Sequence, residues 1–168
     1  MDFETSKEKF IQTWGVLGGS WGINRTMAQI HALLLISHVE LSAEDVMEQL
    51  SISRGNANQN LRDLIDWGLV YRAYKTGERK EFFTAEKDIW AVAKQIVKER
   101  RKREIEPVKK VLNELKATKT NKESEAQKHF LKMIGNIKDV VGKMDASVEK
   151  LIKLEESAIV GTLFKIFK

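Results

Sequence analysis

The stretch from Leu41 to Phe83 constrains this chain more than any other part of the sequence. It reads LSAEDVMEQLSISRGNANQNLRDLIDWGLVYRAYKTGERKEFF. Two short helix signatures with a tight turn between them come first, and two alternating strand-like runs joined at a glycine follow. A helix-turn-helix followed by a β-hairpin is the order of elements in a winged helix. We therefore predict a mainly α fold, an α+β winged helix with a two-stranded wing.

Capping residues mark where the two helices of this stretch begin and end. Ser42 opens the first helix, and acidic residues in its first turn suit the positive end of the helix dipole. Ser53 is the expected N-cap of the second helix, which runs from Arg54 to about Trp67. Gly68 follows where a left-handed residue commonly ends a helix.

The wing is predicted from residues 69–75 and 79–84, with a turn at 76–78. Thr84 is the expected N-cap of the next helix, which continues into the basic run KERRKRE (98–104). This run has two interpretations: it contacts phosphates that flank a DNA site, or it forms the solvated face of a connecting helix.

The second helix of the pair has a composition that helix formation alone does not favour. RGNANQN has poor helix propensity and many hydrogen-bonding groups, whereas a solvated helix face would favour Glu and Lys. In the major groove, Asn and Gln pair with adenine and Arg pairs with guanine. The candidate base-reading residues are Arg54, Asn56, Asn58, Gln59 and Arg62. Ser53 and the free N–H groups of the first helical turn are candidates for holding a phosphate.

The tip of the predicted hairpin is basic, with Lys75, Arg79 and Lys80. In winged-helix geometry such a tip reaches the flanking minor groove or the DNA backbone. The alternative is a soluble turn with no role in binding. The helix pair at this spacing from the hairpin favours the DNA-binding interpretation.

Two helices are expected before this stretch. The apolar residues that share one face of the first helix, within residues 1–22, are Phe3, Phe10, Trp14 and Leu17. Four glycines at positions 15, 18, 19 and 22 indicate close backbone packing, a kink or a break. Asn24 is the expected N-cap of a core helix at 25–37, in which His31 is a packed or exposed residue rather than a metal ligand.

The C-terminal part is expected to be helical and to mediate dimerisation. Pro107 permits a new first turn, residues 117–125 resemble an exposed loop, and a last helical region runs from about residue 123 to the end. A break is expected between Gly142 and Ser147. The apolar residues recur at spacings of 3 and 4, the period of a packed helix pair. For the tail AIVGTLFKIFK (158–168), packing in a dimer interface is favoured over a membrane surface.

The expected domains are therefore a winged helix at 1–103 and a helical dimerisation region at 104–168. Two operator half-sites need two subunits, which favours a homodimer on double-stranded DNA.

Composition excludes several classes of function. The 168 residues contain no cysteine, which excludes disulfides and thiolate metal sites and fits a reducing compartment such as the cytoplasm. A net charge of +5 suits a nucleic-acid partner. No nucleophile elbow, metal-ligand spacing or dinucleotide loop is present, so neither an enzyme, a metal nor a cofactor is predicted. No apolar run reaches the roughly 18–20 residues that span a bilayer.

The blocks SISRGNANQNLRDLIDWGLV (51–70) and GERKEFFTAEKDIW (77–90) closely resemble the GbsR-type branch of the MarR-like winged helix-turn-helix transcriptional regulators. The likeness extends over residues 1 to about 105 and includes the W-G-x-x-G-G-S-W-G stretch, whereas the C-terminal third matches only in being helical and charged. The resemblance implies a homodimer on a palindromic operator, usually a repressor. For some members it also implies control of choline and glycine-betaine (osmoprotectant) genes.

That last implication leads to a ligand hypothesis. Trp14, Trp21 and Trp90 would help to line an effector pocket, between the DNA-binding domain and the dimer helices, that holds a quaternary ammonium compound by cation–π attraction. The simpler interpretation is that these tryptophans fill the core and the domain junction. The alternative to DNA binding is a winged helix that acts only as a protein-interaction module.

Overall fold

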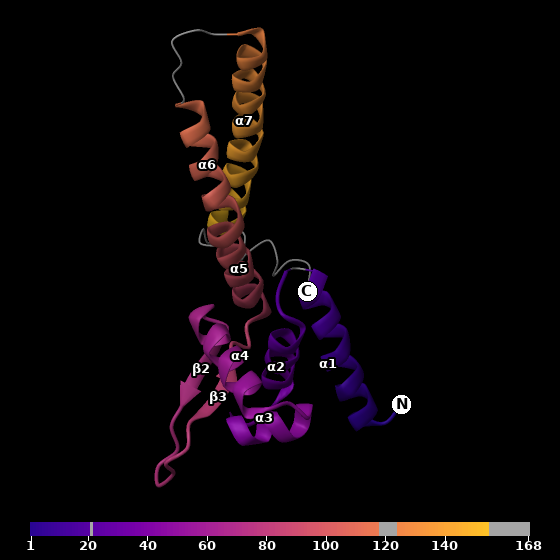
Figure 1. Cartoon of the computed structure of the whole chain (residues 1–168). Coiled ribbons are helices and arrows are strands. Elements are labelled where there is room, and N and C mark those ends of the chain that lie inside the picture. Colours follow the sequence, from indigo (N-terminus) through magenta and orange to yellow (C-terminus); the bar gives the residue numbers. More distant parts are fainter. Residues whose placement is uncertain (21, 118–123, 155–168) are drawn as a thin grey trace. The chain divides into compact units, whose positions relative to one another are not determined.

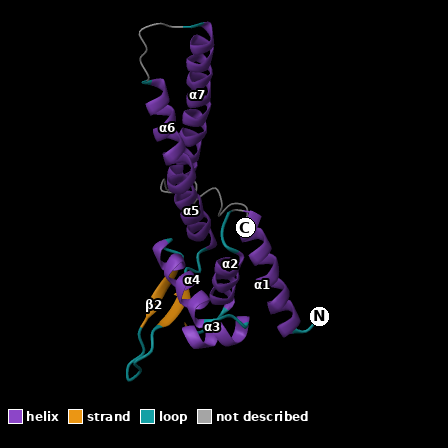
Figure 2. Cartoon of the chain, in the orientation of Figure 1, coloured by secondary structure: helices purple, strands orange, loops and turns teal. Residues whose placement is uncertain are grey.

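The computed structural model describes residues 1–20, 22–117 and 124–154. The chain divides into two compact units, Met1–Gln95 and Ile96–Lys168, and each is described by itself. Helices make up most of the described chain, and the strands are short (Figure 2). The mainly α winged-helix fold predicted from the sequence is confirmed.

The first unit opens with α1 (Phe3–Ser20), which packs along α2 (Arg25–Ile36) (Figure 1). The glycines of α1 do not break the helix; two of them allow the contact. A Cβ atom at position 18 would overlap the Cβ of Ala28, and one at position 15 would lie 2.7 Å from Cγ of Gln29. The helices are thus closer than side chains at these positions would permit.

This close approach corrects the predicted inner face of α1. The buried residues are Ile11, Gly15 and Gly18, not the larger apolar residues beside them. Phe3 is 76% exposed and Leu17 is also exposed, while Phe10 and Trp14 are half-buried. Small residues form the contact because only they let the two backbones meet.

Helix α2 is the core of the first unit, and both of its ends are capped. Asn24 Oδ1 accepts a hydrogen bond from Thr26 N at 2.8 Å, which confirms the predicted N-cap. At the other end, the Lys87 ammonium donates to the carbonyls of Leu34, Leu35 and Ser37 at 2.7, 2.9 and 2.8 Å. A cation among the last carbonyls suits the negative end of the helix dipole.

The helix-turn-helix consists of α3 (Ala43–Leu50) and α4 (Arg54–Asp66). Ser42 and Asp45 form a reciprocal capping box at the start of α3, and Ser53 Oγ accepts from Asn56 N at the start of α4. Both predicted N-caps are confirmed. The turn between the helices includes Ser51 in the left-handed region, with φ at 50°.

The wing consists of β2 (Val70–Ala73) and β3 (Phe82–Ala85), which are antiparallel, with Val70 opposite Ala85. The strands are shorter than predicted. A third strand, β1 (Leu41–Ser42), was not predicted; it pairs with β3 and gives the order β1-β3-β2. Gly68 (φ 68°) and Gly77 (φ 86°) adopt the left-handed conformation that ends α4 and turns the hairpin.

The prediction that Thr84 caps the next helix is wrong. Thr84 lies inside β3, where its backbone belongs to the sheet. Helix α5 (Ile89–Arg100) begins one turn later, and Asp88 Oδ1 accepts hydrogen bonds from Trp90 N and Ala91 N at 2.8 and 3.3 Å. The sheet pairing therefore moves the start of the helix to the next residue that can cap it.

The second unit is built from consecutive helices. The end of α5 continues through a π-helical turn, η1 (Arg101–Ile105), into α6 (Glu106–Lys116), and α7 (Glu125–Leu154) packs against α6. Leu112 and Ile134 are buried. Most of the predicted 117–125 loop and the whole 158–168 tail lie outside the described residues.

The predicted break between Gly142 and Ser147 is wrong, because α7 is continuous there. Asp145, which lies within this stretch, is buried in the unit. Its carboxylate accepts a hydrogen bond from Arg101 Nε, a second from Arg101 Nη2 at 3.1 Å and a third from Lys109 at 2.5 Å. These long-range ion pairs satisfy the carboxylate, so it does not form hydrogen bonds to nearby backbone N–H groups that would compete with the helix.

We expect Asp145 to stabilise the helical unit only above its own pKa. The hydrogen bonds from Arg101 and Lys109 hold the pKa of Asp145 well below its ordinary value of 3.8. This contribution is present above the unfolded-state pKa and is lost as the pH falls through the folded-state pKa, below about pH 4. Asp145→Asn should lower the free energy of unfolding at neutral pH by about 1–3 kcal/mol, because the ion pairs are lost. The loss is no larger than this because the two cations are only partly buried and regain water.

Urea denaturation at a series of pH values, followed by circular dichroism, checks this expectation. The difference between the parent and Asp145→Asn should shrink as the pH is lowered below about 4. A difference that stays constant down to the acid end would contradict a stabilising role for the charged carboxylate.

Candidate nucleic-acid interface

Helix α4 presents a polar face and buries an apolar one. Ala57, Leu61 and Leu64 are buried, and Ile65 is half-buried. Of the candidate DNA-binding residues on this helix, the exposed ones are Ser53, Arg54, Asn56, Gln59 and Arg62. Asn58 is half-buried at the edge of the sheet.

Several of these side chains already have partners. Arg54 pairs with Glu44 of α3 at 3.4 Å, and Gln59 donates to Asp63 at 3.0 Å. Both contacts are between exposed groups, so they are weak and can open when a ligand competes. Arg62 is exposed and has no ion-pair partner among the described residues, which leaves its guanidinium available.

Asn60 is a functional candidate that the sequence analysis missed. It is buried, and its amide donates to the Asn56 carbonyl at 2.8 Å and to Asn56 Oδ1 at 2.6 Å. Asn60 thereby fixes the orientation of the exposed Asn56 amide. The spacing of four residues within RGNANQN was the signal for this pair.

The candidate residues of the wing lie in and beside its tip. Lys75 pairs with Glu40 at 3.7 Å and lies over the Phe82 ring, 4.1 Å from its centroid. Arg79 and Lys80 are exposed in the loop between β2 and β3. The tip therefore keeps two cations in solvent, whereas Lys75 is held beside the tip by Glu40 and Phe82.

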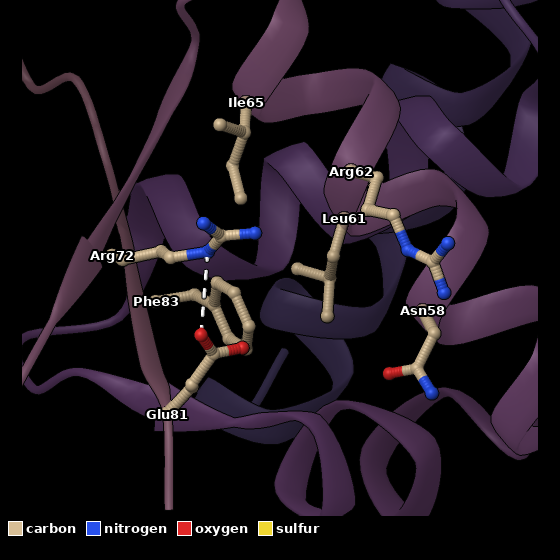
Figure 3. Close-up of a pocket in the computed structure, with 7 residues that line it drawn as sticks. All are labelled: Asn58, Leu61, Arg62, Ile65, Arg72, Glu81 and Phe83. Carbon is tan, nitrogen blue, oxygen red and sulfur yellow. Dashed lines mark ion pairs between the residues drawn. The ribbon is translucent and has the colours of Figure 1, made fainter.

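A cavity of about 210 Å³ lies between α4 and the sheet (Figure 3). The residues that line it are Asn58, Leu61, Arg62, Ile65, Arg72, Glu81 and Phe83. Arg72 of β2 forms an ion pair with Glu81 at 3.5 Å. Arg72 could not be identified from the sequence, because only the register of the hairpin brings it to this cavity.

Two of the three tryptophans of the predicted effector pocket lie in the described part of the chain, Trp14 in α1 and Trp90 in α5. Trp14 donates from Nε1 to His31 Nδ1 at 3.3 Å and lies near Phe10. Trp90 is largely exposed, and Trp21 lies outside the described residues. His31 is buried, and this burial, with a smaller contribution from the charge of Lys87, lowers the pKa of its imidazole to about 4. His31 is therefore a neutral core residue.

Among the described residues, no group of three or more His, Asp or Glu side chains is placed to hold a metal ion. No helix in that part of the chain has the length and apolar character needed to cross a membrane.

Comparison with known families identifies the domain that carries this interface. The sequence model of the MarR family matches residues 21–79, which span the core helix, the helix-turn-helix and the first half of the wing. This segment is similar to the winged helix of the MarR family. The match supports the expectation of a DNA-binding regulator of transcription rather than an enzyme.

One solved structure shares its fold with most of the chain. A crystal structure described as a transcriptional regulator superimposes with a TM-score of 0.66 at 17% identity, over 90% of this chain and 98% of that one. S. aureus MepR, as a point mutant bound to an oligodeoxyribonucleotide, matches with a TM-score of 0.42 at 14% identity, over 84% of this chain and 94% of that one. No curated protein matches the sequence.

Proposed function

We propose that this protein is a sequence-specific transcriptional regulator that binds a palindromic operator in double-stranded DNA as a homodimer and represses transcription in the cytoplasm. The observation that carries the proposal is the exposed, amide-rich face of α4 within a MarR-family winged helix. Its first turn would enter the major groove, since the N-terminal residues of a recognition helix contact base edges.

Charge on the wing supports the same orientation. Arg79 and Lys80 extend beyond the strands and would reach the flanking minor groove or its phosphates. Ser53 and the N-terminal N–H groups of α4 would hold a phosphate at the other end of the interface.

Helix α7 supports the homodimer, because it has a second apolar face besides the one packed on α6. Its exposed residues recur at spacings of 3, 4, 3 and 4, and they are Phe130, Met133, Ile137, Val140 and Met144. This is the period of a helix–helix seam. A helix that leaves such a stripe in water needs a partner, and a second copy of the chain supplies an identical stripe.

The close resemblance to the GbsR-type branch favours choline and glycine-betaine genes as the regulated set. A quaternary ammonium compound would then be the effector, and Trp14, Trp21 and Trp90 are the candidate cage residues. Isothermal titration calorimetry with choline and with glycine betaine tests this part of the proposal. If no heat is measured at millimolar ligand, the proposed cage is ruled out, while the proposed DNA-binding function is unaffected.

A gel-shift titration with the DNA upstream of the protein's own gene tests the main proposal. A specific band at moderate salt is expected. A protein-interaction module is the alternative function, and the absence of specific binding to this DNA and to any duplex selected from a random pool would favour it.

Two arginine variants test how the interface reads DNA. Arg62→Ala should weaken operator binding by about 1–3 kcal/mol and relax the base preference at one position, because a base contact is lost. Arg79→Ala should weaken binding to all sequences about equally and reduce the steepness of the salt dependence, because a phosphate contact is lost. Competition assays with single-base operator variants measure both effects, and parental behaviour of both mutants would show that the proposed docking is wrong.

A further inference from the structure

We propose that the cavity between α4 and the wing is a seat for a DNA phosphate, and that Arg72 is the residue that holds it. This inference rests on the proposed DNA-binding function and adds a site to it. Figure 3 shows Arg72 reaching from the sheet toward α4 with Glu81 beside it, while Arg62 and Asn58 lie on the other side of Leu61.

The position of the cavity selects the kind of ligand. With α4 in the major groove and the wing tip in the flanking minor groove, one sugar–phosphate strand must pass between them, because such a strand separates the two grooves. The cavity lies between α4 and the strands that carry the wing tip. A phosphate of that strand is therefore the group that meets the cavity first.

The lining has the chemistry that a phosphate requires. Two guanidinium groups and one carboxylate leave an excess of one positive charge, and the Asn58 amide adds a hydrogen-bond donor. Arginine binds phosphate oxygens through paired N–H groups. Leu61 and Phe83 are buried and form the apolar part of the lining.

The ion pair between Arg72 and Glu81 can be exchanged for a contact between Arg72 and a phosphate. Both side chains are about half-exposed, at 46% and 52%, and their nitrogen and oxygen atoms are 3.5 Å apart. An exposed pair of this length contributes little to stability, so a phosphate can displace Glu81. Glu81 holds the guanidinium in place in the free protein, and it opposes every phosphate that enters, whatever the base sequence.

The consequence is that Glu81 lowers the affinity for DNA in general. Removing the carboxylate should strengthen binding to random sequence, whereas removing Arg72 should weaken it. Neither change should alter which bases are preferred, because phosphate contacts carry no direct sequence information.

Fluorescence anisotropy with a fluorescein-labelled duplex of random sequence, titrated at several salt concentrations, tests the site without knowledge of the operator. Arg72→Ala should bind about tenfold more weakly and reduce the salt slope by about one ion. Arg72→Lys should keep the slope, because the charge remains, but it should lose part of the affinity because an ammonium cannot form the paired contact. Glu81→Gln should bind about threefold more tightly.

Lys110→Ala is the matched control. It removes one exposed positive charge from α6, in the helical unit, and should leave affinity and slope close to those of the parent. Thermal unfolding followed by circular dichroism establishes that each variant is folded.

Three results would overturn the proposal. Arg72→Ala, while folded, could bind random DNA with parental affinity and slope. It could weaken binding only to a selected operator, which would make Arg72 a base-reading residue. The parent protein could fail to bind any duplex even at low salt, and in that case the proposed function would fail together with the site.

Discussion

Replacing Ile137 and Val140 by lysine together is expected to convert the proposed dimer to a monomer. These two residues lie in the middle of the exposed stripe on α7, at 43% and 57% exposure. Two like charges from each chain would face each other at a self-complementary interface, and burying unpaired charge costs several kcal/mol. Operator affinity should fall by about a thousandfold or more, because each winged-helix unit would then bind its half-site alone.

Sedimentation velocity or light scattering measures the mass, and gel shifts measure the affinity. The control variant Asp139→Asn with Ala146→Lys makes the same net change of two positive charges, by removing one negative charge and adding one positive charge at exposed positions of α7 outside the stripe. The control should remain dimeric. If the Ile137 and Val140 variant also stays dimeric with its helical content unchanged, the interface lies elsewhere, and the exposed apolar residues of α1 become the next candidates.

Gly18→Ala is expected to destabilise the winged-helix unit, although alanine normally stabilises a helix. The new Cβ would overlap that of Ala28, and neither methyl group can rotate away, so α1 and α2 must separate. Overpacking of this kind costs about 1–3 kcal/mol. The loss should appear as a lower midpoint in urea denaturation.

Gly19→Ala is the neighbouring control, because a Cβ at this position meets nothing within 4 Å. It should be neutral or stabilise the protein by up to about 1 kcal/mol through helix propensity. Equal effects at positions 18 and 19 would contradict the close packing of α1 against α2.

These packing features show where sequence reasoning succeeded and where it failed. The N-caps at Asn24, Ser42 and Ser53 were predicted correctly because a cap depends on residues within one turn. The inner face of α1 was predicted wrongly because hydrophobicity alone points to Phe3 and Leu17. The actual contact depends on the position of Ala28 in α2, which lies directly opposite Gly18.

Long-range pairing explains the remaining errors. A strand of two residues such as β1 has no periodicity to detect, and its pairing with β3 is not local. The break between Gly142 and Ser147 was predicted wrongly because Asp145, within this stretch, is satisfied by Arg101, which lies 44 residues earlier in the chain.

The candidate site was predicted only in part for the same reason. The exposed face of α4 follows from a helical wheel, and the structure confirms the exposure of Arg54, Asn56, Gln59 and Arg62. Asn58 is less accessible than predicted, because the sheet lies against that edge of the helix. Asn60 and Arg72 were missed, since one acts through a neighbour and the other depends on hairpin register.

Ser42 has two structural roles, and together they bear on how operators can vary. It is the last residue of β1, paired with Phe82 of the wing, and it is also the N-cap of α3. Strand β1 therefore attaches the start of α3 directly to β3 of the wing. The distance between the major-groove contacts and the wing contacts cannot stretch, so a base pair inserted within a half-site should abolish recognition. A change in the spacing between half-sites must be accommodated by parts of the protein other than the pairing of β1 with β3.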